Sequence, residues 1–251
     1  MKKYNRRELI IIVPAHNEEL RLPNSPHFKK LAKNALLCFV DDGSSDNTLK
    51  VIADLAKKVN GLALNLPTNV GKAEAIRQAY QYINKQYAPR FVGYLDADFA
   101  FSELSIKNFV NQSMKKLERE QSLSAVISSR VNLSGRKIER SKSRHYISRI
   151  LITIIGIFIN NLPYDSQSGL KIFRNSRKFN ASMSKSFKTK WFFDIELLIR
   201  TDSLSARRLW EEPILEWKDI AGSHLTMKKF PKLILEIFQI IQIGRSLQRK
   251  H

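Results

Sequence analysis

Carboxylates placed directly after apolar runs are the side chains of this 251-residue sequence that are best suited to chemistry. Asp96 and Asp98 are separated by a single residue at the end of such a run. Two carboxylates at that spacing can bind a divalent cation such as Mg²⁺ or Mn²⁺, which bridges phosphate oxygens and neutralises a leaving diphosphate. Such triplets also arise often by chance, and Asp98 can instead cap, with Ser102, a helix that begins near Glu103. In isolation the triplet favours the capping role.

Two further motifs combine polar side chains with a glycine. Asp41 and Asp42 precede Gly43 in the run DDGSSD, where carboxylates can accept hydrogen bonds from a ribose or a base while the backbone turns tightly. An acidic turn followed by a helix cap explains that run equally well. The run NVGK places Gly71 and Lys72 at a helix start, so free amides and an ammonium group can face a phosphate. Alone, it is more simply a helix N-terminus with a solvated lysine.

Histidine, arginine and aromatic side chains supply the remaining candidates. His16 follows the first apolar run and can contact a ligand, although a single histidine is more often structural. Arginine forks can bind phosphates in a bidentate manner, although a run of arginines is usually a solvated face. The arginines in question are Arg130, Arg140 and Arg144. Aromatic side chains that can stack on a sugar or line an acyl groove, with core packing as the default, are Trp191, Phe192 and Phe193.

Alternating strands and helices are expected to position these side chains. Continuous apolar runs predict strands, each compact enough for a sheet buried on both faces, at 9–13, 36–40, 62–66 and 91–95. Apolar residues at helical spacing predict helices over 47–59, with Ser45 or Asp46 as the N-cap, and over 72–86. This alternation indicates an α/β fold with a parallel sheet built from right-handed crossovers.

The carboxyl ends of the predicted strands carry the polar clusters. His16 follows the first strand, Asp41 and Asp42 end the second, and Asp96 and Asp98 follow a later one. Ligands of parallel sheets gather beyond these strand ends. We therefore expect side chains from three distant segments to meet at one edge of the sheet.

Composition and charge limit the classes of function. Hydrophobic residues make up 43% and charged residues 26%, which is typical of a globular protein. The single cysteine, Cys38, excludes a disulfide framework and a zinc site of several thiolates. The net charge is +20; residues 1–98 carry 15 basic and 10 acidic side chains, and residues 99–251 carry 28 and 13. This charge favours a polyanionic partner, such as nucleic acid, a phospholipid surface or a phosphorylated substrate.

Considered together, the motifs have a defined order. The first four are residues 12–19 (IVPAHNEE), 39–46 (FVDDGSSD), 69–72 (NVGK) and 95–98 (LDAD). In this order they resemble the motifs of glycosyltransferase family 2. The later ones are residues 165–173 (DSQSGLKIF), 190–198 (KWFFDIELL), 216–217 (EW) and 222–225 (GSHL). These are similar to dolichyl-phosphate glucosyl- and mannosyltransferases, which are polyprenyl-phosphate hexosyltransferases, and the resemblance covers about residues 8–230.

The resemblance implies a fold and a reaction. The fold would be GT-A, a Rossmann-like fold that binds a nucleotide sugar on a mostly parallel central sheet, here with amphipathic C-terminal helices. The enzyme would transfer a hexose with inversion from a nucleotide-diphosphate sugar to a polyprenyl or dolichyl phosphate, with UDP-glucose favoured over a GDP-sugar. Mg²⁺ or Mn²⁺ would be the cofactor.

The resemblance also implies roles for individual residues. The donor would be bound by Pro14, Ala15, His16, Glu18, Asp41, Asp42, Gly71, Lys72 and Asp96. The metal would be held by Asp96 and Asp98. The catalytic residues would be Asp98, Arg130 and Asp165, the last orienting the nucleophile, and the acceptor phosphate would lie near Arg130, Ser141 and Arg144. Two departures from the family pattern are His16, where a tyrosine is common, and Phe99-Ala100, where many relatives have a polar residue.

The chain is expected to divide by function. Residues 1–229 would form the GT-A domain, with 8–98 binding the nucleotide and 99–229 the acceptor, and residues 230–251 would form a basic amphipathic helix. No stretch is expected to span a bilayer. The helix around 147–159, the C-terminal helix and the basic residues would instead bind the cytoplasmic face of a membrane peripherally, because anionic lipids attract each nearby Lys or Arg by about 1 kcal/mol.

Two alternative functions remain open. A family 2 glycosyltransferase that acts on a glycan or a lipid-linked oligosaccharide would use a neutral hydroxyl and need a general base, whereas a lipid phosphate is already anionic. A basic nucleic-acid-binding protein would use the +20 surface. No zinc or helix-turn-helix signature occurs, and such a protein would have no use for the carboxylate clusters at 41–42 and 96–98. We therefore expect no nucleic-acid partner.

Overall fold

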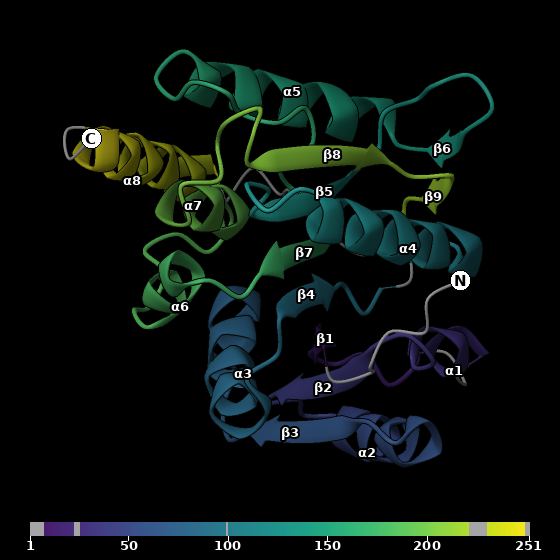
Figure 1. The fold of residues 1–251 in the computed structure, drawn as a ribbon. Coiled ribbons are helices and arrows are strands. Elements are labelled where there is room, and N and C mark those ends of the chain that lie inside the picture. Colours follow the sequence, from purple (N-terminus) through teal and green to yellow (C-terminus); the bar gives the residue numbers. More distant parts are fainter. Residues whose placement is uncertain (1–7, 23–25, 99, 221–229, 249–251) are drawn as a thin grey trace.

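Alternating apolar runs form the strands of one sheet, and the amphipathic segments between them cover both of its faces (Figure 1). The computed structural model describes residues 8–22, 26–98, 100–220 and 230–248. Within these residues the strands of this sheet are β1 (Leu9–Ala15), β2 (Leu36–Asp42), β3 (Leu62–Leu66), β4 (Phe91–Leu95), β5 (Ala125–Ser129), β7 (Leu170–Arg174) and β8 (Leu209–Pro213). The helices are α1 (Pro26–Leu31), α2 (Thr48–Val59), α3 (Lys72–Tyr87), α4 (Glu103–Arg119), α5 (Lys142–Gly156), α6 (Arg177–Met183), α7 (Phe193–Arg200) and α8 (Phe230–Gln248). The α/β class is confirmed.

The strand order is β3-β2-β1-β4-β7-β5-β8. The first four strands of the chain are parallel to one another, as the crossover pattern predicts. β7 lies between β4 and β5 and runs antiparallel to both, whereas β5 and β8 are parallel. The sheet is therefore mostly parallel, with one reversed strand among those described. A short second sheet pairs β6 (Lys137–Glu139) with β9 (Glu216–Lys218).

Side chains of β1 alternate between two hydrophobic clusters, because consecutive residues of a strand point to opposite faces. Leu9 and Ile11 pack with α1, α2 and α4, whereas Ile10 and Ile12 pack with α3, α6 and α7. The prediction that every one of the first four strands is buried on both faces is wrong for β3. Its side chains alternate between partly buried and exposed, because it is an edge strand with a neighbour on one side only.

The start of α4 decides between the two roles of Asp98. Ser102 caps this helix by accepting a hydrogen bond from the amide of Ser105 at 3.2 Å. Asp98 instead accepts from the amide of Ala100, also at 3.2 Å. Ser102 provides the cap without help, so Asp98 is left for the site at the strand end.

The start of α2 differs slightly from the prediction. Asn47 occupies the N-cap position and makes no side-chain cap hydrogen bond. Asp46, one residue earlier, accepts from the amide of Thr48 at 2.9 Å. The predicted carboxylate therefore satisfies a helix amide, from outside the N-cap position.

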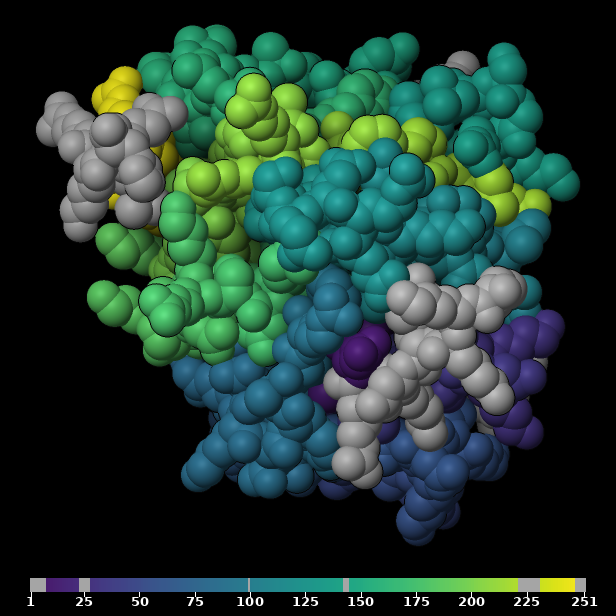
Figure 2. Space-filling view, viewed as in Figure 1, coloured from purple at the N-terminus to yellow at the C-terminus, as the bar shows by residue number. Residues whose placement is uncertain are grey.

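α5, α7 and α8 enclose a third hydrophobic cluster that includes Ile155, Phe192 and Ile240. These helices lie at the upper left of Figure 1, and Figure 2 shows the later part of the chain above the N-terminal part. None of the helices in the described ranges is long and apolar enough to cross a bilayer.

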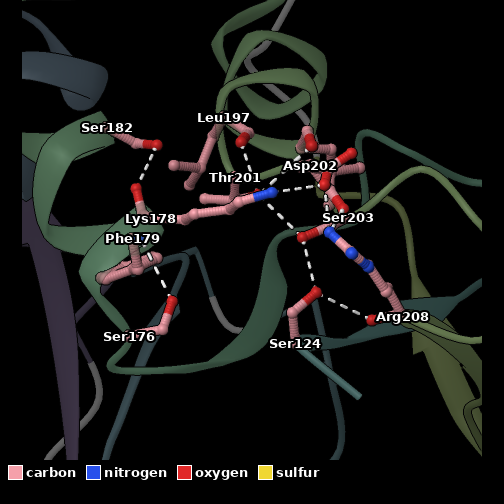
Figure 3. Close-up of polar contacts among 11 residues, drawn as sticks. Ser124, Ser176, Lys178, Phe179, Ser182, Leu197, Thr201, Asp202, Ser203 and Arg208 are labelled. Carbon is pink, nitrogen blue, oxygen red and sulfur yellow. Dashed lines mark hydrogen bonds and ion pairs between the residues drawn. The ribbon is translucent and has the colours of Figure 1, made fainter. Parts of the chain in front are cut away.

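A polar cluster closes the turn after α7 (Figure 3). Asp202 has a left-handed φ of 56° and pairs with Lys178 of α6 at 2.6 Å and with Arg208. The hydroxyl oxygens of Ser203 and Ser124 are 2.9 Å apart. These contacts tie α6, α7 and the entries to β5 and β8 together, which fixes the helix whose first turn reaches the candidate site.

Candidate active site

The predicted polar clusters meet where β1 and β4 are neighbours. The strand order reverses there, since β2 lies on the other side of β1 and β7 on the other side of β4. A cavity of about 290 Å³ opens at this edge and is lined by Pro14, Ala15, His16, Glu18, Asp42, Lys72, Asp96, Ala97 and Asp98. We call it the donor cavity. It gathers all residues predicted to bind the donor except Asp41 and Gly71.

Asp41 and Asp42 have different surroundings. Asp42 accepts hydrogen bonds from the amides of Val70 at 2.8 Å and Gly71 at 2.9 Å, which ties the loop after β2 to the start of α3. The carbonyl oxygen of Asp42 accepts from His16 Nδ1 at 2.9 Å. Asp41 is buried, and among the described residues its Oδ1 has no hydrogen-bond partner. A buried acceptor without a donor is costly, so Asp41 Oδ1 keeps the capacity to accept an N–H or O–H group, although Asp41 is not among the residues that line the donor cavity.

Acidic side chains crowd the donor cavity. Burial raises the pKa of Asp98, and the charge of Asp96 raises it further. Burial also raises the pKa of Glu18, against the opposing charge of Arg21, whose Nε lies 2.9 Å from Glu18 Oε2. Such an excess of negative charge is relieved by a divalent cation, so Asp96 and Asp98 fit Mg²⁺ or Mn²⁺. The described residues contain no group of three His, Cys, Asp or Glu side chains that could hold a metal, so diphosphate or water oxygens would have to complete the shell.

Lys72 stands between the donor cavity and a larger one. Its Nζ lies 2.5 Å from Asp96 Oδ1. Partial burial works against the ammonium charge, yet Asp96 and Asp194 raise the pKa of Lys72 above its ordinary value. The second cavity has a volume of about 360 Å³ and shares Lys72, Asp96 and Asp98 with the donor cavity. We call it the acceptor cavity.

The acceptor cavity is rich in cations. They are Lys72, Arg130, Arg140 and Lys190. Its other walls are Ile147, Ser148, Gln167, Trp191, Phe193, Asp194, Trp217, Asp219 and Ile220. Burial and the charge of Arg130 lower the pKa of Arg140, which is the effect of two cations held close together. A bound anion would relieve that repulsion. Gly71 and Lys190 also line a third cavity of about 230 Å³ at the start of α3.

Arg130 is held by Asp165. Its Nε and Nη2 each lie 2.6 Å from a different oxygen of the Asp165 carboxylate, and its amide donates to the same group at 2.9 Å. Although burial alone would raise it, Arg130 holds the pKa of Asp165 below its ordinary value. The Arg130 guanidinium also lies 5.0 Å from the centre of the Trp217 ring. Asp165 thus supports Arg130 and is not among the residues that line the acceptor cavity.

The predicted acceptor residues are not all brought together. Ser141 is exposed and does not line the acceptor cavity. The side chain of Arg144 lies outside the described residues, as do Phe99 and the motif at 222–225. Arg140 and Lys190 line the cavity instead. Arg140 was among the arginines suggested as phosphate ligands, whereas Lys190 had no signal beyond its place in the 190–198 motif.

Gly169 and Asp194 are site residues that the sequence interpretation missed. Asp194 lines the acceptor cavity, and its Oδ1 lies 2.6 Å from the ammonium group of the buried Lys171. Gly169 backs Asp96: its carbonyl oxygen accepts from the Asp96 amide at 2.9 Å. A Cβ on Gly169 would lie 2.1 Å from Asp96 Oδ2, so any other residue there would displace the Asp96 side chain. Both residues lie inside quoted motifs, but their contacts are with residues far away in the sequence.

Gly169→Ala is expected to displace the Asp96 carboxylate and to lower activity about a hundredfold, because an error of about 1 Å in a reacting group has that effect. Gly156→Ala is the control, since the nearest atom to its added Cβ is 4.0 Å away. Initial rates and unfolding midpoints of both variants check this. Full activity in Gly169→Ala would mean that Asp96 does not need this position.

Comparison with known sequences decides the family. Residues 10–185 match the family described as Glycosyl transferase family 2. The chain belongs to this family. The glycosyltransferase is 29% identical over 246 residues to a dolichyl-phosphate beta-glucosyltransferase of Trichomonas vaginalis, covering 91% of this chain and 71% of that protein. It is 29% identical over 238 residues to the dolichyl-phosphate beta-glucosyltransferase of Dictyostelium discoideum, covering 86% of this chain and 68% of that protein.

Solved structures show the same fold at low sequence identity. S. aureus TarS, residues 1–349, matches with a TM-score of 0.53 and 17% identity, covering 94% of this chain and 65% of that one. The mannosyltransferase PcManGT from Pyrobaculum calidifontis, in complex with GDP-Man and Mn²⁺, matches with a TM-score of 0.53 and 16% identity, covering 96% and 73%. The fold of this glycosyltransferase is therefore GT-A, as expected.

Proposed function

We propose that this glycosyltransferase transfers glucose from UDP-glucose, with inversion at the anomeric carbon, to a dolichyl or other polyprenyl phosphate. The names of its relatives support this sugar and this acceptor. The structural observation that supports it best is the acceptor cavity, where four cations gather and where Asp96 and Asp194 are each paired with a lysine. Such a cavity suits an anionic nucleophile. Membership of the family favours this reaction over nucleic-acid binding.

The two substrates would lie in the two adjoining cavities. The walls of the donor cavity all come from residues 8–98, whereas most walls of the acceptor cavity come from residues 99–229. Asp41 and His16 would contact the nucleoside, and Lys72 the diphosphate. Arg130 and Arg140 would bind the phosphate of the lipid.

Asp96 and Asp98 would hold Mg²⁺ or Mn²⁺. The bound cation would neutralise the leaving diphosphate. Lys72, paired with Asp96, adds a positive charge at the boundary between the two cavities. The chain itself therefore places acidic groups where a cation is needed and basic groups where a second phosphate must approach.

The acceptor needs no general base in this reaction. A phosphate monoester is largely ionised near neutral pH, since its second pKa is about 6. Its oxygen attacks the anomeric carbon, the bond from that carbon to the diphosphate breaks, and UDP leaves with the bonding electrons. The protein has to hold two anions in line and cancel their repulsion.

A neutral hydroxyl acceptor would require a base, and the carboxylates nearest to Arg130 and Lys171 are poor candidates. Arg130 holds the pKa of Asp165 low, which makes this carboxylate a weak proton acceptor. Asp194 is paired with Lys171. Among the described residues that line the acceptor cavity, Asp219 is the acid outside the proposed metal pair and the Lys171 network, so a glycan acceptor would have to rely on it.

A donor and acceptor assay tests the proposal. Purified protein, dolichyl phosphate and Mg²⁺ or Mn²⁺ are mixed with radiolabelled UDP-glucose, UDP-GlcNAc, GDP-mannose or GDP-glucose. We expect labelled lipid from UDP-glucose, and none when the metal is chelated. Labelled lipid from GDP-mannose alone would contradict the proposed donor, and no labelled lipid from any donor would contradict the proposed acceptor.

We also propose that α5 and α8 bind an anionic membrane surface. Large apolar side chains are exposed on these helices or directly after α5, at Tyr146, Ile150, Ile154, Ile157, Phe158, Ile234, Leu235 and Phe238. Lys232 and Arg245 of α8 are exposed beside them. Apolar side chains flanked by cations match the chemistry of a lipid interface. Ile147 and Ser148 of α5 also line the acceptor cavity, so a lipid phosphate would reach it from this side.

Glutamates in place of Ile150 and Ile157, which are 59% and 72% exposed, are expected to weaken vesicle binding at least about tenfold by adding repulsion and removing apolar area. Leu104→Glu is the matched control, because Leu104 is 56% exposed but lies on α4. Co-flotation with vesicles containing phosphatidylglycerol measures the effect. Equal binding of all variants would rule out this surface.

A further inference from the structure

Lys171 is a fully buried cation in the middle of the sheet, on β7 between β4 and β5. A buried charge is costly unless it is paired and hydrogen-bonded. The ammonium group lies 2.6 Å from Asp194 Oδ1 and also donates to the carbonyl oxygen of Ser168. Tyr94 of β4 donates its hydroxyl to the same Asp194 oxygen. Two neighbouring strands therefore fix the Asp194 carboxylate.

Asp194 is the member of this network that reaches substrate. It lies in the first turn of α7 and lines the acceptor cavity together with Lys72 and Arg130. A carboxylate in that wall would repel both a lipid phosphate and a nucleotide diphosphate if its charge were not cancelled. The buried ammonium group of Lys171 is the cation in direct contact with it.

We infer that Lys171 is a positioning residue of the transfer reaction, which acts through Asp194: it cancels the carboxylate charge in the cavity wall, so that two anionic substrates can bind side by side. The inference rests on the proposed function for its anionic acceptor, and the same repulsion would act on the donor diphosphate. A purely structural role makes a different prediction. Buried ion pairs can often be replaced by apolar groups without loss of stability, and substrate affinity would then not depend on the Asp194 charge.

Four proteins separate the two roles: Lys171→Met, Asp194→Asn, the double variant, and Lys178→Met as control. Lys178 forms an ion pair of the same length, 2.6 Å, with Asp202 at the turn after α7 (Figure 3), and neither residue lines the acceptor cavity. Lys171→Met is expected to raise KM for dolichyl phosphate about tenfold, because it leaves a like charge in the wall. The double variant should return KM to within about threefold of the wild-type value, since both charges are gone. The control should not change KM.

The split between KM and kcat supplies a readout that a structural defect would not reproduce. Asp194 faces Lys171 of β7 and Tyr94 of β4. Lys171→Met should raise KM for dolichyl phosphate while kcat stays within about threefold of the wild-type value, because the uncompensated carboxylate weakens binding of the anion. A loss confined to kcat, with KM unchanged, contradicts the inference.

Two further comparisons keep the test decisive. If Lys171→Met does not fold, Asp194→Asn should have a lower KM for the lipid phosphate than the double variant, because it keeps an extra cation; equal values would overturn the inference. A folded double variant that is as impaired as Lys171→Met would overturn it too.

Pyrophosphate binding, measured by calorimetry, separates this inference from the proposed function. If wild type transfers no sugar to lipid phosphate, the proposed function fails, whereas weaker pyrophosphate binding in Lys171→Met that Asp194→Asn reverses still supports the role of Lys171.

Discussion

Asp98→Asn is expected to lower sugar transfer about a thousandfold. If Asp98 is a metal ligand, as proposed, its loss removes several kcal/mol of charge stabilisation from the leaving diphosphate, and each 1.36 kcal/mol is a factor of ten in rate. The same change should leave the metal-free protein as stable as wild type or more stable. Burial and the charge of Asp96 raise the pKa of Asp98, so the fold already disfavours its charged form, and an amide removes that penalty. Loss of activity together with retained stability distinguishes a functional carboxylate from a structural one.

Asp54→Asn is the matched control for this prediction, because Asp54 is an exposed carboxylate on α2 that lines neither cavity. Initial rates over a range of Mn²⁺ concentrations and thermal unfolding without metal provide the two readouts. An Asp98→Asn enzyme within about tenfold of wild-type activity at saturating Mn²⁺ would show that Asp98 is not a required metal ligand.

Arg130→Met is expected to destabilise the fold by about 3–5 kcal/mol, because it leaves the buried Asp165 carboxylate without its cation. Adding Asp165→Asn should recover most of that stability, since no unpaired charge is left. Transfer should stay at least about a hundredfold below wild type in both variants, because the lipid phosphate loses the guanidinium that approaches it. Denaturant unfolding and initial rates measure the two effects separately.

Arg130→Lys refines this prediction. It keeps the positive charge but cannot reproduce the bidentate contact with Asp165, so we expect intermediate stability and a raised KM for the lipid phosphate. If the double variant with Arg130→Met and Asp165→Asn recovered activity as well as stability, Arg130 would serve only to neutralise Asp165. Arg140 would then be left as the arginine that binds the acceptor.

The Arg130–Asp165 pair also predicts an acid dependence of stability. The folded-state pKa of Asp165 is below its ordinary value, which is about 3.9 in an unfolded chain. Its contribution to stability is therefore complete above that value and is lost as the pH falls through the lower folded-state pKa. The free energy of unfolding of Asp165→Asn, measured against pH, should consequently decline less steeply than that of wild type below about pH 4.

The convergence of the residues that line the donor cavity could be predicted from the sequence because local signals determine it. Continuous apolar runs specify β1, β2 and β4, and His16, Asp42 and Asp96 follow from the rule that ligands gather at the carboxyl ends of parallel strands. Side-chain periodicity does not encode strand direction, so the antiparallel insertion of β7 could not be predicted. Periodicity does not encode strand order either, so β3 could not be recognised as an edge strand.

The acceptor half depends on contacts between distant segments. Gly169 is required by Asp96, 73 positions earlier, and Lys171 by Asp194 on a helix that follows. Sequence spacing gives no indication of either contact. Ser141 was predicted at the acceptor phosphate from the motif alone, whereas the adjacent Arg140 lines the cavity, because neighbouring residues at the start of α5 point in different directions.

Acceptor choice tests the central claim most directly. Radiolabelled UDP-glucose and Mn²⁺ are incubated with dolichyl phosphate or with dolichol of the same chain length, using wild type and Asp219→Asn. We predict labelled lipid with the phosphate only, at a rate that Asp219→Asn lowers by less than about tenfold, since an ionised phosphate needs no base. Transfer to dolichol that is lost in Asp219→Asn would contradict the claim and would indicate a hydroxyl acceptor activated by that carboxylate.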